Sequence, residues 1–272
     1  MSPKDIVALK GKRKSTMLTA YDFPTAALVD KAGIDMILVG DSLANVVLGL
    51  ESTTQVGMAE MLHHAKAVTR AAKQALVVGD MPYESYQINP EECVKNARRF
   101  IDEAHCGAVK LEWFDKCIEV TEKIVKAGIP VMGHIGLTPQ TADKIGGFKV
   151  QGKDAEAGRR LIEQAQALEK AGCFALVLEC VPEKLAGMIT EKLRIPTIGI
   201  GAGRLCDGQV LVIHDLLGLF ERFKPKFVKQ YVNLSPQIFK AVEAYKNEVI
   251  AGTFPAPEHT FSIKEEELKK LS

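Results

Sequence analysis

The chain has 272 residues, of which 47% are hydrophobic, and its 35 basic side chains nearly balance its 34 acidic ones. This length and composition exclude a disordered chain and suit one α/β barrel domain, which usually takes roughly 250 residues. The balanced charge gives no long-range field to attract nucleic acid or an acidic membrane surface. We therefore expect a small molecule as the partner.

The N-terminal stretch MSPKDIVALKGKRKSTM is charged and lacks the unbroken apolar run of a signal peptide. No segment reaches the roughly 20 apolar residues that a membrane span needs. The six cysteines are scattered without a C-x-x-C pair, which is typical of reduced thiols that pack in a core. These features predict a cytoplasmic protein that does not enter the membrane.

Short apolar runs alternate with longer segments of helical periodicity along the chain. The predicted strands are 16–22, 36–42, 75–82, 108–113, 130–136, 175–180, 196–203 and 209–215. The predicted helices are 24–32, 58–73, 90–105, 115–127, 154–171 and 183–193, followed by an amphipathic helix from SPQIFKAVEAYKNEVIAG and a solvated charged tail. Glycines in KAGID, KAGIP and KAGCF predict helix C-caps just before strands.

Apolar strands that alternate with helices predict a parallel sheet covered by helices. Eight such units in one chain of this length favour an α/β fold of the (β/α)₈ TIM-barrel type, although an open doubly wound sheet is the rival. No linker rich in proline, serine or glycine divides the chain. We expect one barrel domain over 1–272, with a short N-terminal extension and C-terminal helices.

Polar residues stand where most of the predicted strands end. They are Asp22, Asp41 with Ser42, Asp80, Lys110 with Glu112, His134, Glu179, and His214 with Asp215. In a barrel, all these ends open on the face that carries active sites. Several carboxylates in one mouth repel one another unless a cation compensates, and hard oxygen ligands suit Mg²⁺. The pattern therefore predicts a magnesium site.

Each of these residues also has a structural interpretation. Asp22, before Phe23-Pro24, fits a helix N-cap better than a ligand. Lys110 and Glu112 lie on one face of a strand, either as a mutual ion pair or as ligand contacts. His134 fits a satisfied core histidine. Glu179 follows an apolar run that should raise its pKa, as a general base requires, unless it forms a structural salt bridge.

Three loops carry further signals. The segment 136–152 is long and polar with a Gly-Gly pair, which is typical of an active-site lid, and 43–57 is similarly long. GIGAG at 199–203 lacks the spacing of a nucleotide-binding motif, so it predicts a wall of the mouth free of side chains.

Strings from residue 16 to residue 261 identify the chain as similar to a known family. They are TAYD, VGDSL, DMPYESY, VKLE, GHIGLTPQ, KVQG, LVLECVP, IPTIGIGAG, PKF and EHTF, in that order. Together they resemble the ketopantoate hydroxymethyltransferases, in the phosphoenolpyruvate/pyruvate-binding barrel superfamily. The resemblance implies transfer of a hydroxymethyl group from 5,10-methylenetetrahydrofolate to 3-methyl-2-oxobutanoate, giving 2-dehydropantoate in pantothenate and coenzyme A biosynthesis. It also implies a homo-oligomer, often a decamer.

The resemblance carries over to the site residue by residue. Asp41 and Asp80 match the aspartates that hold Mg²⁺ and contact the chelated substrate, and Glu112 matches a glutamate associated with the metal. The substrate contacts are Ser42, Lys110, which meets the carboxylate, and His134, near the keto acid. Glu179 matches the proton acceptor.

The chain departs from the family pattern beside the site. Trp113-Phe114 follows Glu112 where two glycines are usual, Ala44 replaces a common glycine, and Met58 opens a helix that usually begins with other residues. Two alternatives stay open. A magnesium-dependent 2-oxo acid aldolase or lyase that needs no folate would use the same carboxylates, whereas a barrel without catalytic activity conflicts with the complete charged set.

Overall fold

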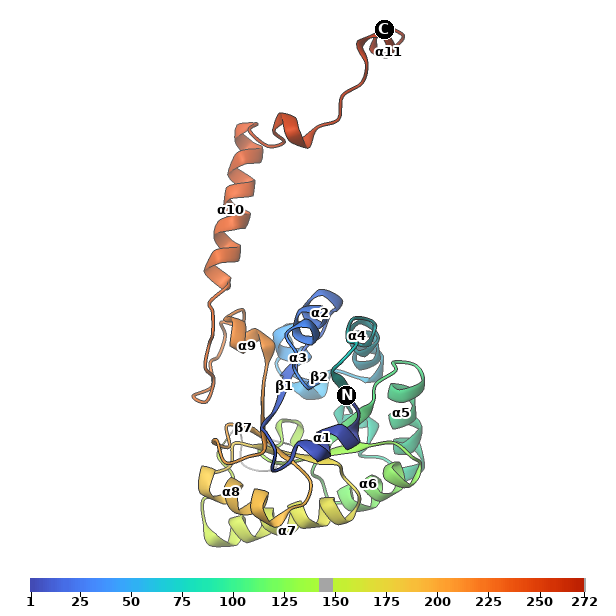
Figure 1. Ribbon diagram of the computed structural model, residues 1–272, viewed down its shortest axis with the longest axis vertical. Coiled ribbons are helices and arrows are strands. Elements are labelled where there is room, and N and C mark those ends of the chain that lie inside the picture. Colours follow the sequence, from blue (N-terminus) through green and yellow to red (C-terminus); the bar gives the residue numbers. More distant parts are fainter. Residues whose placement is uncertain (142–148, 272) are drawn as a thin grey trace.

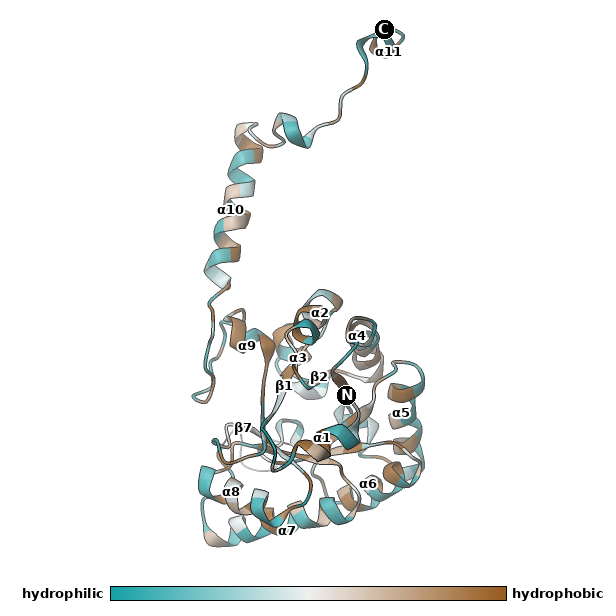
Figure 2. Ribbon diagram, in the orientation of Figure 1, coloured by the Kyte–Doolittle hydropathy of each residue, from teal (hydrophilic) through white to brown (hydrophobic). Residues whose placement is uncertain are grey.

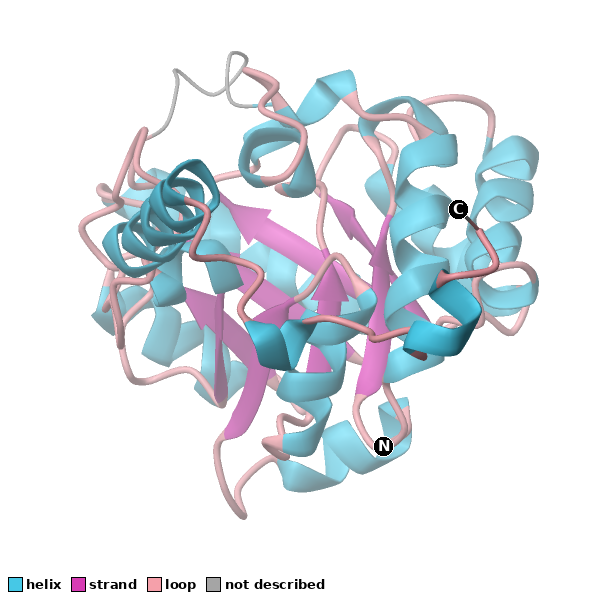
Figure 3. Cartoon of the chain, turned by 90° about the horizontal axis from the view of Figure 1, so that it is seen from above, coloured by secondary structure: helices cyan, strands magenta, loops and turns pink. Residues whose placement is uncertain are grey.

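The computed structural model describes residues 1–141 and 149–271. Eight parallel strands form a closed barrel in which each strand pairs with its neighbours in chain order and β8 pairs with β1. They are β1 (Ser15–Thr19), β2 (Met36–Val39), β3 (Leu76–Asp80), β4 (Ala108–Glu112), β5 (Val131–Gly136), β6 (Ala175–Glu179), β7 (Thr197–Ile200) and β8 (Gly208–Leu211). Figure 3 shows these strands enclosed by helices. Closure confirms the (β/α)₈ barrel and excludes the open doubly wound sheet.

Helices cover the barrel between the strands. The predicted ones are observed as α2 (Phe23–Lys31), α4 (Met58–Ala71), α5 (Pro90–Asp102), α6 (Cys117–Lys126), α7 (Ala155–Lys170) and α8 (Glu183–Lys192). The connection 43–57 contains the short helix α3 (Leu43–Val46) and the 3₁₀ turn η1 (Thr53–Gln55), and a second 3₁₀ turn, η2 (Tyr83–Ser85), follows β3. The three predicted C-cap glycines, Gly33, Gly128 and Gly172, adopt positive φ and so confirm the helix ends.

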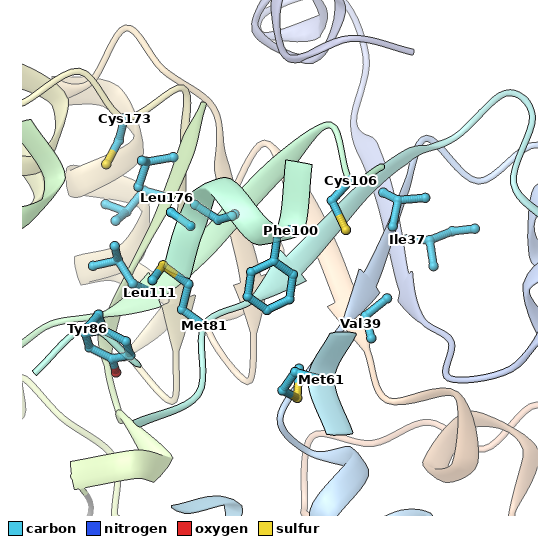
Figure 4. Packing of buried hydrophobic residues seen from close by; sticks show 14 of the residues in the cluster. Ile37, Val39, Met61, Met81, Tyr86, Phe100, Cys106, Leu111, Cys173 and Leu176 are labelled. Atoms are coloured by element: carbon cyan, nitrogen blue, oxygen red, sulfur yellow. The ribbon is translucent and has the colours of Figure 1, made fainter. Parts of the chain in front are cut away.

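The core has two layers because successive strand residues face opposite sides. Outward residues such as Ile37, Val39 and Leu111 pack under the helices, and Figure 4 shows part of this outer layer. Inward residues such as Met36 and Val78 form a separate inner cluster. Ile6 of the N-terminal helix α1 (Pro3–Leu9) belongs to this inner cluster, so α1 packs against the residues that fill the barrel.

The eighth strand is shorter than predicted. β8 ends at Leu211, and the helix α9 (Ile213–Leu217) begins directly after Val212. The backbone N–H of Ile213 donates to Thr19 Oγ1 at 2.9 Å, which ties this turn to β1. His214 and Asp215 therefore lie on a helix beyond the strand, contrary to the sequence prediction.

The C-terminal part leaves the barrel. Helix α10 (Ser235–Ala251) extends away from the barrel wall, and the 3₁₀ turn η4 (Pro257–His259) and the helix α11 (Glu265–Leu268) lie farther out (Figure 1). No residue of α10 is buried. Its surface carries both hydrophilic and hydrophobic residues (Figure 2), among them Phe239 at 66% exposure and Ile250 at 78%. The amphipathic helix is confirmed, and its apolar side stays largely exposed, with a ring contact between Tyr245 and Phe254 at its end.

No helix in the described residues has both the length and the apolar character that crossing a membrane demands. All six cysteines are free thiols, and five of them are buried, as the sequence predicted.

Candidate active site

The inward positions of the barrel change from apolar to charged along the strands. On β3 the inward residues are Leu76, Val78 and Asp80, and on β6 they are Ala175, Val177 and Glu179. The same parity places Lys110 and Glu112 after Ala108 on β4, and His134 after Met132 on β5. Strand alternation alone therefore brings these side chains together at the C-terminal mouth.

The predicted site residues on these strand ends are deeply buried. Asp41, Asp80, Lys110, Glu112 and His134 each keep 6% exposure or less, and the Glu179 side chain keeps 16%. Asp41 directly follows Gly40 at the end of β2, and its backbone N–H donates to Asp80 Oδ2 at 3.3 Å. Ser42 is next in the chain, and its Oγ lies 2.8 Å from the Tyr21 hydroxyl.

Lys110 pairs with Asp80. Its Nζ lies 2.6 Å from Asp80 Oδ1, and both side chains are almost fully buried. Of the two alternatives for Lys110, a mutual ion pair with Glu112 or a ligand contact, the structure shows neither directly, since the ammonium group turns to Asp80 on the neighbouring strand. Burial acts to lower the pKa of Lys110, but the charges of Asp80, Asp41 and Glu112 outweigh it and raise that pKa. Lys110 stays positively charged.

The carboxyl groups outnumber the charges that could balance them. Burial raises the pKa of Glu112 well above its usual range, with Asp41 adding to the effect and Lys110 opposing it. Burial likewise raises the pKa of Glu179 to about 8, although the charge of Lys110 acts in the opposite direction. This confirms the predicted shift at Glu179. A bound cation would favour the ionised form of both groups.

His134 lies between two of these carboxyl groups. Its Nδ1 is 3.5 Å from Glu112 Oε1 and its Nε2 is 3.2 Å from Glu179 Oε2. Burial, and then the charge of Lys110, lower the pKa of His134 well below its usual value, so the ring is neutral. Within the described part of the chain neither ring nitrogen has a well-formed hydrogen bond, although both are buried. His134 is therefore buried as the structural interpretation expected, but its ring nitrogens face the carboxyl groups of the site and not groups of an apolar core.

The donor set suits a hard divalent cation. No three His, Cys, Asp or Glu side chains in residues 1–141 and 149–271 converge into a ready metal cage. Magnesium needs none, because it is usually held by one or two carboxylates, with water and substrate oxygens in the other positions. The surplus of buried carboxyl groups fits such an ion, and one or two of Asp41, Asp80 and Glu112 could bind it directly, with water and substrate oxygens in the other positions.

Glycine has two different roles beside the site. A Cβ on Gly136, whose φ is +96°, would meet the carbonyl oxygen of Glu179 at 2.2 Å, so glycine allows β5 to approach the end of β6. A Cβ on Gly79 would meet Phe100 of α5 at 2.4 Å. The glycine before Asp80 thus allows α5 to pack closely against β3.

Asp22 and His214 contact other parts of the chain. Asp22 caps α2, where its Oδ1 accepts from Thr25 N–H at 2.8 Å, which confirms the N-cap. His214 on α9 lies 5.5 Å from the Tyr21 ring. The predicted lid, 136–152, includes residues 142–148, which lie outside the described residues.

Sequence reasoning missed Gln140 and Tyr86. The Gln140 amide donates to Asp41 Oδ2 at 2.8 Å and accepts from the Tyr86 hydroxyl. Neither residue stands at a strand end, so the pattern of polar endings could not find them. The available signal was a polar residue within GLTPQ, directly after β5.

The chain resembles solved barrels in fold. It matches a phosphoenolpyruvate phosphomutase from Streptomyces platensis subsp. rosaceus with a TM-score of 0.63 at 16% identity, covering 97% of this chain and 92% of that one. It also matches a phosphonopyruvate hydrolase in complex with oxalate and Mg²⁺, with a TM-score of 0.59 at 14% identity, covering 99% and 95%. At this identity, the likeness shows the barrel architecture alone.

Sequence relatives are much closer. A 3-methyl-2-oxobutanoate hydroxymethyltransferase of Syntrophomonas wolfei subsp. wolfei is 59% identical over 262 residues, which covers 96% of this chain and 95% of the relative. One of Enterococcus faecalis is 57% identical over 258 residues, covering 95% and 94%. The family model of the ketopantoate hydroxymethyltransferases matches residues 1–257. The chain therefore belongs to the ketopantoate hydroxymethyltransferase family.

Proposed function

We propose that the protein transfers a hydroxymethyl group from 5,10-methylenetetrahydrofolate to 3-methyl-2-oxobutanoate, giving 2-dehydropantoate for pantothenate biosynthesis. The observation that carries this proposal is the family match over residues 1–257, in a chain whose barrel mouth holds a buried cluster of carboxyl groups with one lysine. A 2-oxo acid is a suitable substrate because its keto and carboxylate oxygens can share one cation.

Each residue of the cluster has a part in this reaction. Asp41, Asp80 and Glu112 would hold Mg²⁺, which would supply positive charge to the keto oxygen as an enolate forms. Lys110, held at 2.6 Å from Asp80, would neutralise the substrate carboxylate, and Ser42 would contact the same substrate.

Proton abstraction falls to Glu179. Its raised pKa makes it a stronger proton acceptor than an ordinary carboxylate once it is ionised. It would take the proton from C3, and the enolate carbon would attack the methylene carbon as one of its two bonds to folate nitrogen breaks. Water would then replace the second nitrogen, which gives the hydroxymethyl group and releases tetrahydrofolate. His134 is neutral, so one of its ring nitrogens can donate a hydrogen bond, and its place between Glu112 and Glu179 would put it near the bound keto acid.

The direct test is an assay of product formation. The protein is incubated with 3-methyl-2-oxobutanoate, methylenetetrahydrofolate and Mg²⁺, and ketopantoate is measured by mass spectrometry. Omission of folate or chelation of the metal should abolish product. Turnover without folate would reveal an aldolase or lyase, and an inactive protein that also fails to bind Mg²⁺ would indicate a barrel without catalysis.

We propose that the protein is a homo-oligomer, the decamer that the family resemblance implies. The support is the uncovered apolar side of α10, which carries Ile238, Phe239, Val242, Tyr245, Val249 and Ile250. Burying this side against another subunit would remove a large apolar area from water. Light scattering should give a mass several times 29.7 kDa, and Phe239→Asp should reduce it.

We also propose a cytoplasmic location. All six cysteines are free, as is usual in a reducing compartment. Fractionation of cells with an antibody to the protein tests this placement.

A further inference from the structure

Gln140 occupies a buried position between three strand ends. It lies in the turn after β5, where the Thr141 backbone N–H donates to the carbonyl of Thr138 at 2.9 Å and the two threonine hydroxyls lie 2.7 Å apart. Its residue exposure is only 4%. A turn closed in this way holds the glutamine backbone in one place.

The hydrogen bonds of Gln140 fix the orientation of its amide. Nε2 donates to Asp41 Oδ2 at 2.8 Å and to the carbonyl oxygen of Met81 at 3.2 Å. A carboxylate oxygen and a carbonyl oxygen both accept hydrogen bonds and do not donate them. Oε1 must then face the Tyr86 hydroxyl, which donates to it. Tyr86 itself lies within the outer apolar layer, where Figure 4 shows it beside Met81 and Leu111.

The backbone of Gln140 reaches a second carboxyl group. Its N–H donates to Glu112 Oε2 at 3.1 Å. One residue thus holds one oxygen each of Asp41, at the end of β2, and of Glu112, at the end of β4. These bonds leave Oδ1 of Asp41 and Oε1 of Glu112 for a cation.

We propose that Gln140 is a positioning residue that aims the carboxyl groups of Asp41 and Glu112 at a shared divalent cation, and that Tyr86 fixes the glutamine amide in the required orientation. This inference rests on the proposed function, because it assigns the residue that organises the metal site. Residues that orient metal ligands in this way usually contribute 10- to 100-fold to metal affinity.

The test uses the full chain and Mg²⁺ alone, titrated by calorimetry. Gln140→Leu should weaken Mg²⁺ binding by about 10- to 100-fold, because Asp41 loses its amide partner. Tyr86→Phe keeps the aromatic ring and should weaken binding by about fivefold, the value of one lost hydrogen bond. Gln166→Leu, the same exchange on an exposed position of α7, should change nothing.

A kinetic readout separates positioning from a general structural role. Saturating Mg²⁺ should restore most of the turnover of Gln140→Leu, because the carboxyl groups themselves are intact. Loss of turnover that Mg²⁺ does not restore, or unchanged Mg²⁺ affinity in both Gln140→Leu and Tyr86→Phe, would overturn the proposal.

Asp41→Asn separates a failure of the role proposed for Gln140 from a failure of the proposed metal site. If it abolishes Mg²⁺ binding while Gln140→Leu binds normally, the metal site stands and the role of Gln140 is wrong. If all three variants bind Mg²⁺ like the unchanged protein, the metal site of the proposed function is wrong as well.

A different observation carries a second inference. A cavity of about 600 Å³ opens beside the cluster, between the loop after β4, the end of β5 and the N-terminal half of α7. Its lining includes Trp113 and Phe114, which directly follow Glu112, together with Asp115 and Arg160. Two aromatic rings, a carboxylate and a guanidinium group therefore border one hollow.

We infer that this cavity binds the folate co-substrate of the proposed function. The aromatic side chains suit the flat pterin ring, and Asp115 suits the amino and N–H edge of that ring. Arg160 pairs with the exposed Glu156 at 2.5 Å and would exchange this partner for the carboxylates of the glutamate tail. Methylenetetrahydrofolate is larger than the keto acid, and a cavity of this size matches the usual range for such ligands.

Arg160 offers a test that leaves the catalytic cluster untouched. Arg160→Ala should raise KM for methylenetetrahydrofolate about tenfold, the effect of one lost charge-assisted contact, with kcat little changed. The neighbouring Arg159→Ala, also exposed on α7 but not part of the lining, is the matched control. Exchange of the C3 proton of the keto acid, which needs no folate, should stay normal in both variants.

Trp113 reports on the same cavity because it is the chain's single tryptophan. Tetrahydrofolate should quench its fluorescence in a saturable way, and Arg160→Ala should weaken that saturation. Absence of saturable quenching, or equal KM values for Arg160→Ala and Arg159→Ala, would overturn the assignment of the cavity. Normal proton exchange in that case would leave the keto acid chemistry of the proposed function standing.

Discussion

The barrel interior has two halves, one toward the N-terminal ends of the strands and one at the C-terminal mouth. Both are built from the inward-facing residues of the same strands. Toward the N-terminal side, Met36, Val78 and Ala108 form an apolar cluster with Ile6 of α1. Toward the mouth, the next inward positions on β3 and β4 are Asp80, Lys110 and Glu112. One half stabilises the closed sheet, and the other buries more carboxyl groups than its single lysine can balance. The apolar half contributes stability while the mouth keeps the polar groups that the chemistry needs.

The largest expected effect is kinetic and belongs to the mouth. Glu179→Gln removes the proposed base while keeping a side chain of equal size, so exchange of the C3 proton with deuterium should fall by about 10²- to 10⁴-fold. Proton NMR of 3-methyl-2-oxobutanoate in deuterated buffer measures it. Calorimetry should show Mg²⁺ binding retained. Exchange at the original rate would reject Glu179 as the base.

The charged half should lose stability when the ammonium group of Lys110 is removed. Lys110→Met leaves Asp80 without its buried partner at 2.6 Å and should lower the free energy of unfolding by about 3–5 kcal/mol. Urea denaturation without Mg²⁺ measures this change. Arg13→Met is the control, because Arg13 pairs with Asp35 but is 52% exposed. An equal loss in both variants would contradict the assigned importance of the buried pair.

The apolar half should respond in stability alone. Met36→Ala removes a fully buried side chain and should lower the free energy of unfolding by about 2–5 kcal/mol through the cavity it leaves. At a temperature where the variant is folded, its Mg²⁺ affinity and its rate of proton exchange should equal those of the unchanged protein. A variant that folds but loses Mg²⁺ affinity would show that the two halves are coupled.

The smallest expected effect is a shift in a pH profile. Only ionised Glu179 can accept a proton, so exchange should rise tenfold per pH unit and level off above its pKa, which is about 8 without a cation. A nearby divalent ion stabilises the carboxylate and lowers that pKa. Exchange rates from pH 5 to pH 9 at saturating Mg²⁺ should therefore level off below pH 8. An inflection above pH 8 would contradict a cation near Glu179.

Much of the site could be predicted because strand parity is a local rule. The apolar runs located all eight strands, and polar endings such as Asp80 and Glu179 identified which side chains reach the mouth. Side-chain partners were harder to predict. Lys110 pairs with Asp80 on the neighbouring strand, a contact that depends on the register between strands. Gln140 reaches the site from a loop, a contact that depends on the path of a turn. Sequence periodicity contains neither kind of information.

The C-terminal helix shows another limit of sequence patterns. The segment SPQIFKAVEAYKNEVIAG has the hydrophobic periodicity of a helix that packs on its own barrel, yet α10 extends away from the barrel. Amphipathicity reports that one side needs a contact, but it does not say which chain provides it.

If α10 packs against other subunits, as we propose, the stability of the protein depends on its concentration. If other subunits cover Phe239 and Ile250, every dissociation returns these side chains to water, and mass action then links unfolding to concentration. A dilute solution should unfold at a lower temperature than a concentrated one. Helix α10, which buries no residue against its own barrel, would then set the dilution at which the folded protein is lost.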